Sequence, residues 1–302
     1  MKAHWVALSL IPGIGGTTAH KLVEQFGTVE DVFAADVTEL ANVPRVTPDM
    51  ARHIHQTALE TVEAEILSLE DEGIAVLTPD DDEYPSLLRA VGDAPVVLFM
   101  QGQVQQRDER AVAIVGTRQP SEHGQRIAEQ LAKGLAAHGW VIVSGLAVGI
   151  DTSAHRGALA ADGGRTLAVL GSGLRVIHPK ENLELAQEIA RRGAVLSELH
   201  PATPPRGPQL MARDRIISGL ARAVIVIEAG EKSGSLDTAA RARKQGRLVL
   251  AVPGSPGTDQ LVASGAGRID VEPLDIAGIS DLVERPYPVS APQEIPRQAG
   301  LW

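Results

Sequence analysis

The residues best suited to bind an anion follow short apolar runs in the middle of the chain. Gly116, Thr117 and Arg118 come directly after the apolar run 111–115, and Ser144 and Gly145 stand at the end of the next run. An arginine presents a planar fork of donors that matches a phosphate group. Backbone N–H groups at the start of a following helix can bind the same group. The pattern predicts a site for a phosphate-bearing ligand.

Other chemistries fit these residues less well. A G-x-G-x-x-G dinucleotide fingerprint would need glycine where Arg118 stands, and the sequence has no G-x-x-x-x-G-K-[ST] phosphate loop. Isoleucine and leucine fill the glycine positions of a nucleophile elbow around Ser144. Asp151 and His155 are four residues apart and could form a catalytic or metal-binding pair, but no third ligand has suitable spacing. We therefore expect structural hydrogen bonding at this pair, and binding without a catalytic residue, metal or cofactor.

The elements that must position these residues alternate between strand and helix. The run 111–115 is too short for a helix and rich in β-branched residues, which is typical of a strand buried on both faces. Ser121 can cap a helix that runs to about His138, and a second buried strand follows at 141–144. A right-handed crossover brings the carboxyl ends of both strands to one edge of a parallel sheet. Ligands bind at that edge, where helix starts point free N–H groups at anions.

The same alternation continues along the chain and predicts an α/β fold with a doubly wound sheet of at least five parallel strands. Further strands are expected at 166–170, 194–198, 223–228 and 248–252, with two more, 74–77 and 96–100, added at one edge. Helices are expected from near Lys180, at 213–220 after a proline-rich loop 200–209, at 235–245 and at 276–284.

Three segments are expected: a helical module over 1–72, the α/β domain over 73–284, and a proline-rich linker or tail over 285–302. In the module, Ile11-Pro12-Gly13-Ile14-Gly15 and the helix after it look like half of a helix-hairpin-helix unit. Val43-Pro44-Arg45-Val46 stands where a second hairpin should be and lacks the glycines. We expect a packing or partner-binding module rather than a strong DNA clamp, because the surrounding acidic excess would repel DNA.

Composition limits the possible classes of protein. The 302 residues include no cysteine, which excludes disulfides and thiolate sites. No apolar stretch approaches the roughly 20 residues of a membrane span, and the N-terminus lacks a signal pattern, so we expect a cytoplasmic protein. The net charge of −10 is uneven: residues 1–105 carry 5 Lys and Arg against 17 Asp and Glu, whereas residues 206–247 carry nine against four. The basic segment is compatible with a phosphate-binding face.

A series of sequence blocks between Ala111 and Ala266 resembles the DNA-processing protein A (DprA/Smf) family and occurs in family order. The blocks include AIVGTR at 113–118, SGLA at 144–147, GID at 149–151, RDRII at 213–217 and SGS at 233–235. The resemblance implies an extended Rossmann-like domain preceded by a sterile-alpha-motif-like helical domain. It also implies a homodimer that binds and protects single-stranded DNA and loads a RecA-type recombinase in natural transformation.

The resemblance also implies roles for particular residues. With the loops above, the DNA-binding set becomes Gly116, Thr117, Arg118, Ser144, Gly145, Lys180, Arg206, Arg213, Arg215, Lys232 and Ser233. The dimer contacts would involve Leu261, Val262, Ile269 and Val271. Three positions depart from the family pattern: Leu210 replaces an aromatic residue that could stack on a base, Asp214 replaces an asparagine, and His178 stands where tyrosine is common.

We therefore expect a single-stranded DNA-binding protein that is not an enzyme, with its preference over double-stranded DNA left open. Its binding should be salt-sensitive and largely independent of base sequence, because phosphate contacts carry no sequence information. The alternative is a nucleotide-processing enzyme on a related Rossmann-like fold. That reading needs a catalytic glutamate near Ser233, where the chain offers Glu228 and Glu231 without the double-glycine loop of such enzymes.

Overall fold

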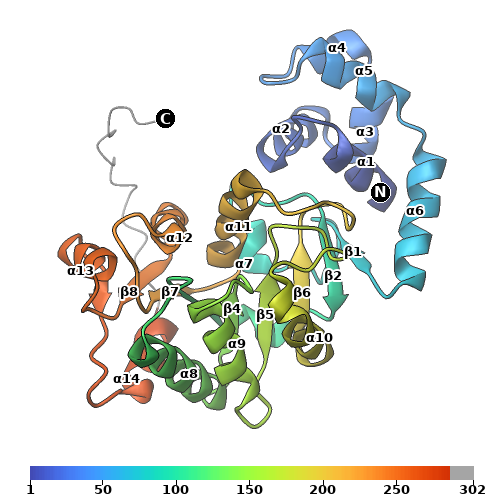
Figure 1. Ribbon diagram of the computed structural model, residues 1–302. Helices are drawn as coiled ribbons and strands as arrows, with labels where there is room; N and C mark the ends of the chain where they lie inside the picture. Colours follow the sequence, from blue (N-terminus) through green and yellow to red (C-terminus); the bar gives the residue numbers. More distant parts are fainter. Residues whose placement is uncertain (286–302) are drawn as a thin grey trace.

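The computed structural model describes residues 1–285 and consists of a helical module joined to an α/β domain (Figure 1). One nine-stranded sheet has the order β1-β2-β6-β5-β4-β3-β7-β8-β9. The strands are β1 Ala75–Leu77, β2 Leu98–Gly102, β3 Ala111–Val115, β4 Val141–Ser144, β5 Thr166–Val169, β6 Ala194–Ser197, β7 Ala223–Val226, β8 Leu248–Ala251 and β9 Gly267–Arg268. Residues 286–302 of the predicted proline-rich tail lie outside the described residues.

The doubly wound parallel sheet predicted from the sequence is confirmed. Strands β3 to β9 pair in parallel, and β1 and β2 join antiparallel at the edge beside β6, as expected for two added strands. Every residue of β3 to β8 is buried, which explains why these segments are continuously apolar rather than alternating. The core therefore lies on both faces of the central strands.

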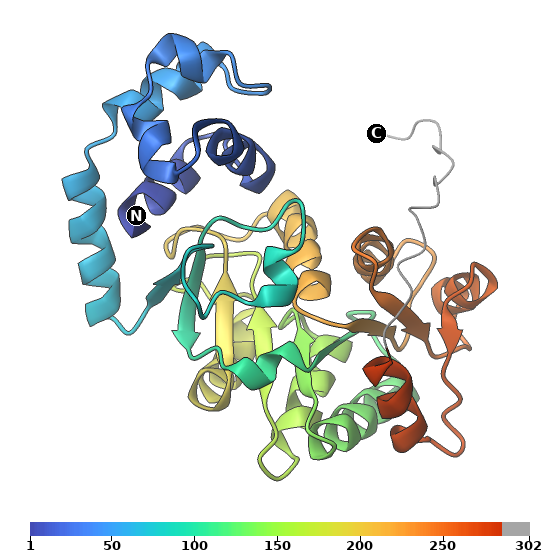
Figure 2. The ribbon, with the colours of Figure 1, turned by 180° about the vertical axis from the view of Figure 1, so that it is seen from behind.

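Helices cover both faces of this sheet. One face carries α8 Glu122–Ala137, α9 Ile150–Leu159, α10 Leu183–Arg192 and α14 Ile276–Glu284; the other carries α7 Ser86–Arg89, α11 Gly207–Gly219, α12 Gly234–Lys244 and α13 Pro256–Ala263. The view from behind shows α14 against α8 (Figure 2). Short 3₁₀ turns occupy Gln106–Glu109 and Lys180–Asn182. Within residues 1–285 we find no helix with the length and apolarity of a membrane span.

Helix α11 begins earlier than the sequence predicted. The expected helix at 213–220 follows a proline-rich loop, but the observed helix starts at Gly207 and includes Pro208 in its first turn. Proline is compatible with this position because the first N–H groups of a helix have no partner within it. As a result Leu210 and Met211 are helical, and both reach the pocket described below.

The helical module contains two hairpins with the same turn. In the first, Ile14 N donates to Ile11 O at 3.0 Å; in the second, Val46 N donates to Val43 O at 3.0 Å. Arg45 has φ +78°, so it takes the left-handed conformation without being a glycine. The module's helices are α1 Lys2–Leu10, α2 Gly16–Phe26, α3 Val29–Ala34, α4 Val37–Ala41, α5 Pro48–Gln56 and α6 Leu59–Asp71. The second hairpin predicted from the sequence therefore exists despite lacking glycines.

The module packs on the α/β domain through the start of α2. The backbone of Gly16 approaches the carbonyl oxygen of Ala94 so closely that any side chain there would clash. Trp5 Nε1 donates to Asp80 Oδ2 at 2.6 Å, which ties α1 to the loop after β1. The first hairpin thus meets backbone of its own chain at the point where it could have met a phosphate. This arrangement favours the packing role.

Candidate nucleic-acid interface

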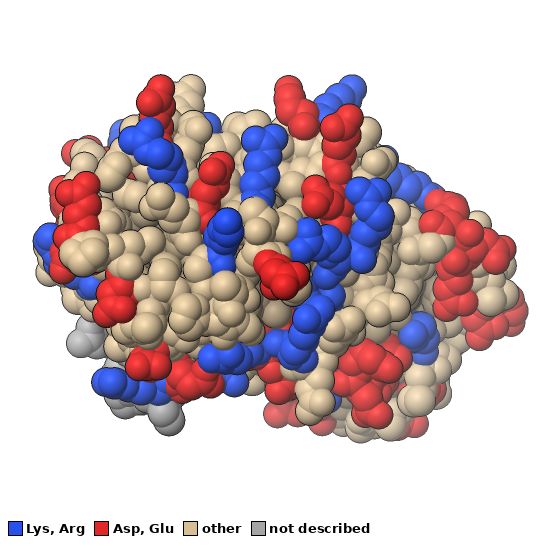
Figure 3. All heavy atoms as spheres, turned by 90° about the horizontal axis from the view of Figure 1, so that it is seen from below, with Lys and Arg blue, Asp and Glu red and all other residues tan. Residues whose placement is uncertain are grey.

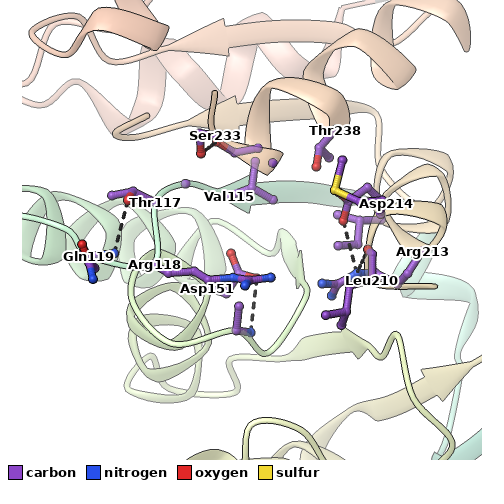
Figure 4. A pocket seen from close by; sticks show the side chains of 16 residues that line it. Val115, Thr117, Arg118, Gln119, Asp151, Leu210, Arg213, Asp214, Ser233 and Thr238 are labelled. Atoms are coloured by element: carbon purple, nitrogen blue, oxygen red, sulfur yellow. Dashed lines mark hydrogen bonds and ion pairs between the residues drawn. The ribbon is translucent and has the colours of Figure 1, made fainter. Parts of the chain in front are cut away.

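A pocket of about 410 Å³ opens where β3 and β7 end (Figure 4). These strands are neighbours in the sheet, but the chain leaves β3 towards β4 and returns to β7 only after β6. Such a reversal is the place where ligands bind in open α/β sheets. The pocket is lined by the segment 115–119, by Ala147 and Asp151, by one side of α11, and by residues near the start of α12.

Arg118 is the exposed cation of this pocket. Its loop is fixed, because Thr117 N donates to Glu228 O at 2.7 Å and Gln119 N donates to Thr117 Oγ1 at 3.2 Å. Figure 4 shows the Arg118 side chain reaching across the pocket. Among the described residues, none hydrogen-bonds or ion-pairs with its guanidinium group. The donors of Arg118 are therefore available to an anion.

The start of α12 faces the same space. Ser233 is its N-cap residue, but no side chain accepts a hydrogen bond from the first amides of the helix. The Ser233 and Ser235 hydroxyl oxygens lie 2.8 Å apart and hydrogen-bond to each other. Ser233, Gly234 and Ser235 all line the pocket. The partial positive charge of the helix start adds to that of Arg118 and favours an anion there.

The start of α8, where the sequence predicted free N–H groups, has a carboxylate beside it. Ser121 N and Oγ donate to the Glu228 carboxylate at 3.1 and 2.8 Å, and Gly124 N donates to Ser121 Oγ at 3.0 Å. A carboxylate from the segment after β7 thus accepts hydrogen bonds from the N-cap residue, and its negative charge lies beside the helix start that was predicted to bind phosphate. Glu228 is also one of the two glutamates on which the enzymatic alternative depends.

Arg213 lies beneath the pocket, with a side chain only 6% exposed. Its Nη1 donates to the carbonyl oxygens of Gly145 and Val169, both at 2.6 Å, and its Nε lies 3.2 Å from Asp214 Oδ1. A side chain at position 145 would clash with this guanidinium group, so glycine is needed there. Arg213 therefore ties the ends of β4 and β5 to α11, and its Nη1 and Nε donors point at the protein itself.

Arg215 is placed on a different side of α11. Its Nη1 and Nη2 donate to the Glu198 carboxylate at 2.7 and 2.6 Å, and its Nε lies 3.5 Å from Asp93 Oδ2. Ser144 is fully buried and donates from Oγ to Ile114 O at 2.6 Å. Neither residue lines the pocket. Internal partners therefore hold both side chains.

The other predicted residues divide into three groups. The structure brings five of them together in the pocket lining: Gly116, Thr117, Arg118, Arg213 and Ser233. Gly145 lies under the pocket against Arg213, whereas three exposed cations lie outside the lining: Lys180, Arg206 and Lys232.

The predicted dimer residues lie on α13 and in the segment after β9. Leu261 and Ile269 are 8% and 2% exposed and belong to the cores on the two faces of the sheet. Val262 and Val271 are partly buried. Of the four, only these two valines have appreciable surface to offer a partner.

Asp151 and His155 have structural roles, as predicted. Asp151 accepts hydrogen bonds from Gly145 N and Ala147 N at 3.1 and 3.3 Å, and burial raises the pKa of its carboxyl group. His155 Nδ1 lies 2.7 Å from Thr166 Oγ1, and burial lowers the pKa of its imidazole to about 3. In residues 1–285 we find no cluster of side chains able to hold a metal ion.

Sequence reasoning missed Asp214 and Met211 as pocket residues. Asp214 lines the pocket, and burial raises the pKa of its carboxyl group to about 6 although Arg213 opposes this shift. Met211 follows from the true start of α11, which reading Pro208 as a first-turn residue would have given, whereas Asp214 already lay in the predicted helix.

A second hollow, of about 500 Å³, lies at the opposite edge of the sheet. Four arginines line it, but Arg165 donates to Asp108 and Gln103 O, and Arg192 donates to Leu159 O at 2.7 Å. On the face seen from below, basic and acidic side chains are interleaved (Figure 3). Positive charge alone therefore does not mark the ligand site in this protein.

Two family models match the chain. Residues 75–277 match DNA recombination-mediator protein A, and residues 7–60 match a SAM-like helix-hairpin-helix tandem. Protein Smf of Synechocystis is 37% identical over 264 residues, covering 86% of this chain and 66% of the relative. DNA processing protein DprA of Bacillus subtilis is 42% identical over 206 residues, covering 66% of this chain and 69% of the relative. The chain thus spans about two thirds of the length of these curated relatives.

Solved structures of DNA processing protein A are also similar to this chain. The X-ray structure of DprA from Streptococcus pneumoniae is 34% identical, with a TM-score of 0.80 over 94% of this chain and 98% of that one. DNA processing protein A from Helicobacter pylori, described for its single-stranded DNA binding mode, is 31% identical, with a TM-score of 0.62 over 69% of this chain and 95% of that one. This chain therefore belongs to the DNA recombination-mediator protein A family.

Proposed function

We propose that this protein binds single-stranded DNA by holding its sugar–phosphate backbone at the pocket between β3 and β7. One observation carries the proposal: the free guanidinium group of Arg118 and the uncapped start of α12 line one pocket at the reversal point of the sheet. Two sets of donors that face one space suit an anion such as a phosphate group. The printed description of the Helicobacter pylori relative supports the same ligand.

Three exposed cations extend this contact along the strand. Arg206 immediately precedes α11, and Lys232 immediately precedes Ser233. Lys180 begins the 3₁₀ turn whose Asn182 Nδ2 donates to Leu146 O at 2.8 Å, which places it beside the loop after β4. Because such contacts neutralise phosphates without reading bases, affinity falls steeply as salt is added.

The wider role that we propose follows the family: a homodimer that protects incoming DNA and hands it to a RecA-type recombinase in natural transformation. The valines at 262 and 271 are the predicted dimer residues with surface left to contribute. We propose no catalytic step, since the Glu228 carboxylate is held by Ser121. Light scattering reports the oligomeric state, and a recombinase-loading assay on single-stranded DNA reports the transfer.

The binding proposal is tested by Arg118→Ala in a fluorescence-anisotropy titration with single-stranded and duplex oligonucleotides at two salt concentrations. Loss of one charge-assisted contact should weaken single-strand binding by about 5- to 100-fold. The magnitude of the slope of log affinity against log salt concentration should fall by about one, as expected for the loss of one phosphate contact. Arg191→Ala is the matched control, because Arg191 is exposed at the other edge of the sheet. Equal affinities for the Arg118 variant and the unmodified protein would refute the proposal.

A further inference from the structure

The pocket combines two kinds of lining that a simple phosphate site would not need. Its rim carries the free donors of Arg118 and of the α12 start, whereas Asp151 and Asp214 contribute carboxylates. Leu210, Met211 and Ile217 add an apolar wall. A phosphate pushed inwards would meet negative charge, so the interior suits an uncharged group with N–H donors and a flat apolar face. A nucleobase has both properties.

The two carboxylates differ in their remaining capacity to accept hydrogen bonds. Asp151 already accepts from two backbone amides of the loop after β4. Asp214 has one neighbouring donor among the described residues, Arg213 Nε at 3.2 Å, while Arg213 directs Nη1 at two carbonyl oxygens. An ionised carboxylate can accept about four hydrogen bonds. Asp214 therefore keeps acceptor capacity on a side chain that is nearly buried.

We propose that Asp214 reads the base of the bound strand and favours guanine, by accepting hydrogen bonds from N1–H and the N2 amino group while the backbone rests on the rim. This inference rests on the proposed function and adds a base preference to it. The two adjacent donors of guanine match the two oxygens of a carboxylate. Thymine offers a single N–H between two carbonyl oxygens, which the carboxylate repels. Stacking on the apolar wall does not distinguish them, since every base has such a face.

The experiment compares three oligonucleotides with the unmodified protein: oligothymidylate, the same strand with one central guanine, and the same strand with hypoxanthine there. Guanine should bind about 5- to 100-fold more tightly than thymine, as expected for a paired hydrogen-bond contact to a base. Hypoxanthine lacks the N2 amino group and should lie between them. Equal affinities for all three strands would overturn the base preference and leave the proposed function intact. Failure to bind any strand would overturn the proposed function itself.

Asp214→Asn should bring the guanine-to-thymine affinity ratio close to one. Asp162→Asn is the matched control: Asp162 carries the same charge, is exposed between α9 and β5 and does not line the pocket, so its ratio should stay unchanged. A ratio that persists in the Asp214 variant would refute the assignment.

A second measurement uses the unmodified protein. Its guanine-to-thymine affinity ratio should fall as the pH is lowered from 7 to 5, because Asp214 gains a proton. The charged groups that act on Asp214 are Arg213 on its own helix, Asp151 on α9, and Asp237 and Arg241 on α12. A ratio that stayed constant across this range would count against Asp214 as the reading group.

Discussion

Arg213→Met removes the guanidinium group that joins three elements beneath the pocket. The carbonyl oxygens of Gly145 and Val169 each accept a 2.6 Å hydrogen bond from Arg213 Nη1, and both would lose this donor inside the protein. A hydrogen bond to a charged group contributes about 1.5–3 kcal/mol. We therefore expect the free energy of unfolding to fall by about 3–5 kcal/mol. The loss of the positive neighbour of Asp214 acts in the same direction.

Urea denaturation at neutral pH measures this effect as a lower midpoint with an unchanged m-value. The control is Arg156→Ala, an exposed arginine on α9, which should change the free energy of unfolding by less than about 0.5 kcal/mol. The sequence-based reading of Arg213 as a phosphate ligand makes the opposite prediction: unchanged stability, weaker DNA binding and a salt slope lower by about one. A loss of stability below about 1 kcal/mol together with that change in slope would refute the structural role.

Three further predictions concern other charged groups. Asp214→Asn should raise the free energy of unfolding at pH 7 by about 3 kcal/mol, because burial raises the pKa of the Asp214 carboxyl group to about 6. In the unmodified protein, stability should decline as the pH rises from about 4 to 6, because the folded state, with an Asp214 carboxyl pKa of about 6, binds more protons in this range than the unfolded chain. The substitution should remove this decline. Urea midpoints measured across the range check both effects. Asp108→Ala should cost about 3–5 kcal/mol, seen in thermal unfolding, because it leaves the buried guanidinium of Arg165 without its ion pair. Glu228→Gln should weaken the cap at Ser121 by about 0.5–2 kcal/mol and tighten single-strand binding in anisotropy titrations, because it removes negative charge beside the Arg118 loop.

The strands could be predicted because their signal is local. Runs such as 111–115 and 223–226 are short, apolar and β-branched, and the structure covers both of their faces with helices. The occupant of the α8 start could not be predicted in this way. Ser121 and Glu228 are 107 positions apart, and nothing near Ser121 shows that a carboxylate will arrive there. From sequence alone, the N–H groups at every helix start on the sheet edge are expected to be free, because a distant side chain that contacts them leaves no local signal.

Arg213 and Arg215 illustrate a second limit of sequence reasoning. Residues two apart in sequence are separated by about 200° of rotation around an α-helix, so the side chains of these two arginines point to nearly opposite sides. One arginine meets carbonyl oxygens under the pocket, and the other meets Glu198 and Asp93 beyond it. The family resemblance gave both as candidate ligands. Only the partners distinguish a free cation from one that holds the fold together.

The different lining of the rim and the interior of the pocket predicts that a single strand is preferred to a duplex. The free donors lie at the rim of the pocket, and the interior is lined by Asp214 and an apolar wall. A backbone on the rim can place an unpaired base inside, where the carboxylate faces its Watson–Crick edge. In a duplex that edge is already paired, and opening it costs a few kcal/mol. A duplex would therefore keep the proposed phosphate contact of Arg118 but lose the base contact. The difference between the affinities for single-stranded and duplex DNA then measures the contribution of the base contact inside the pocket.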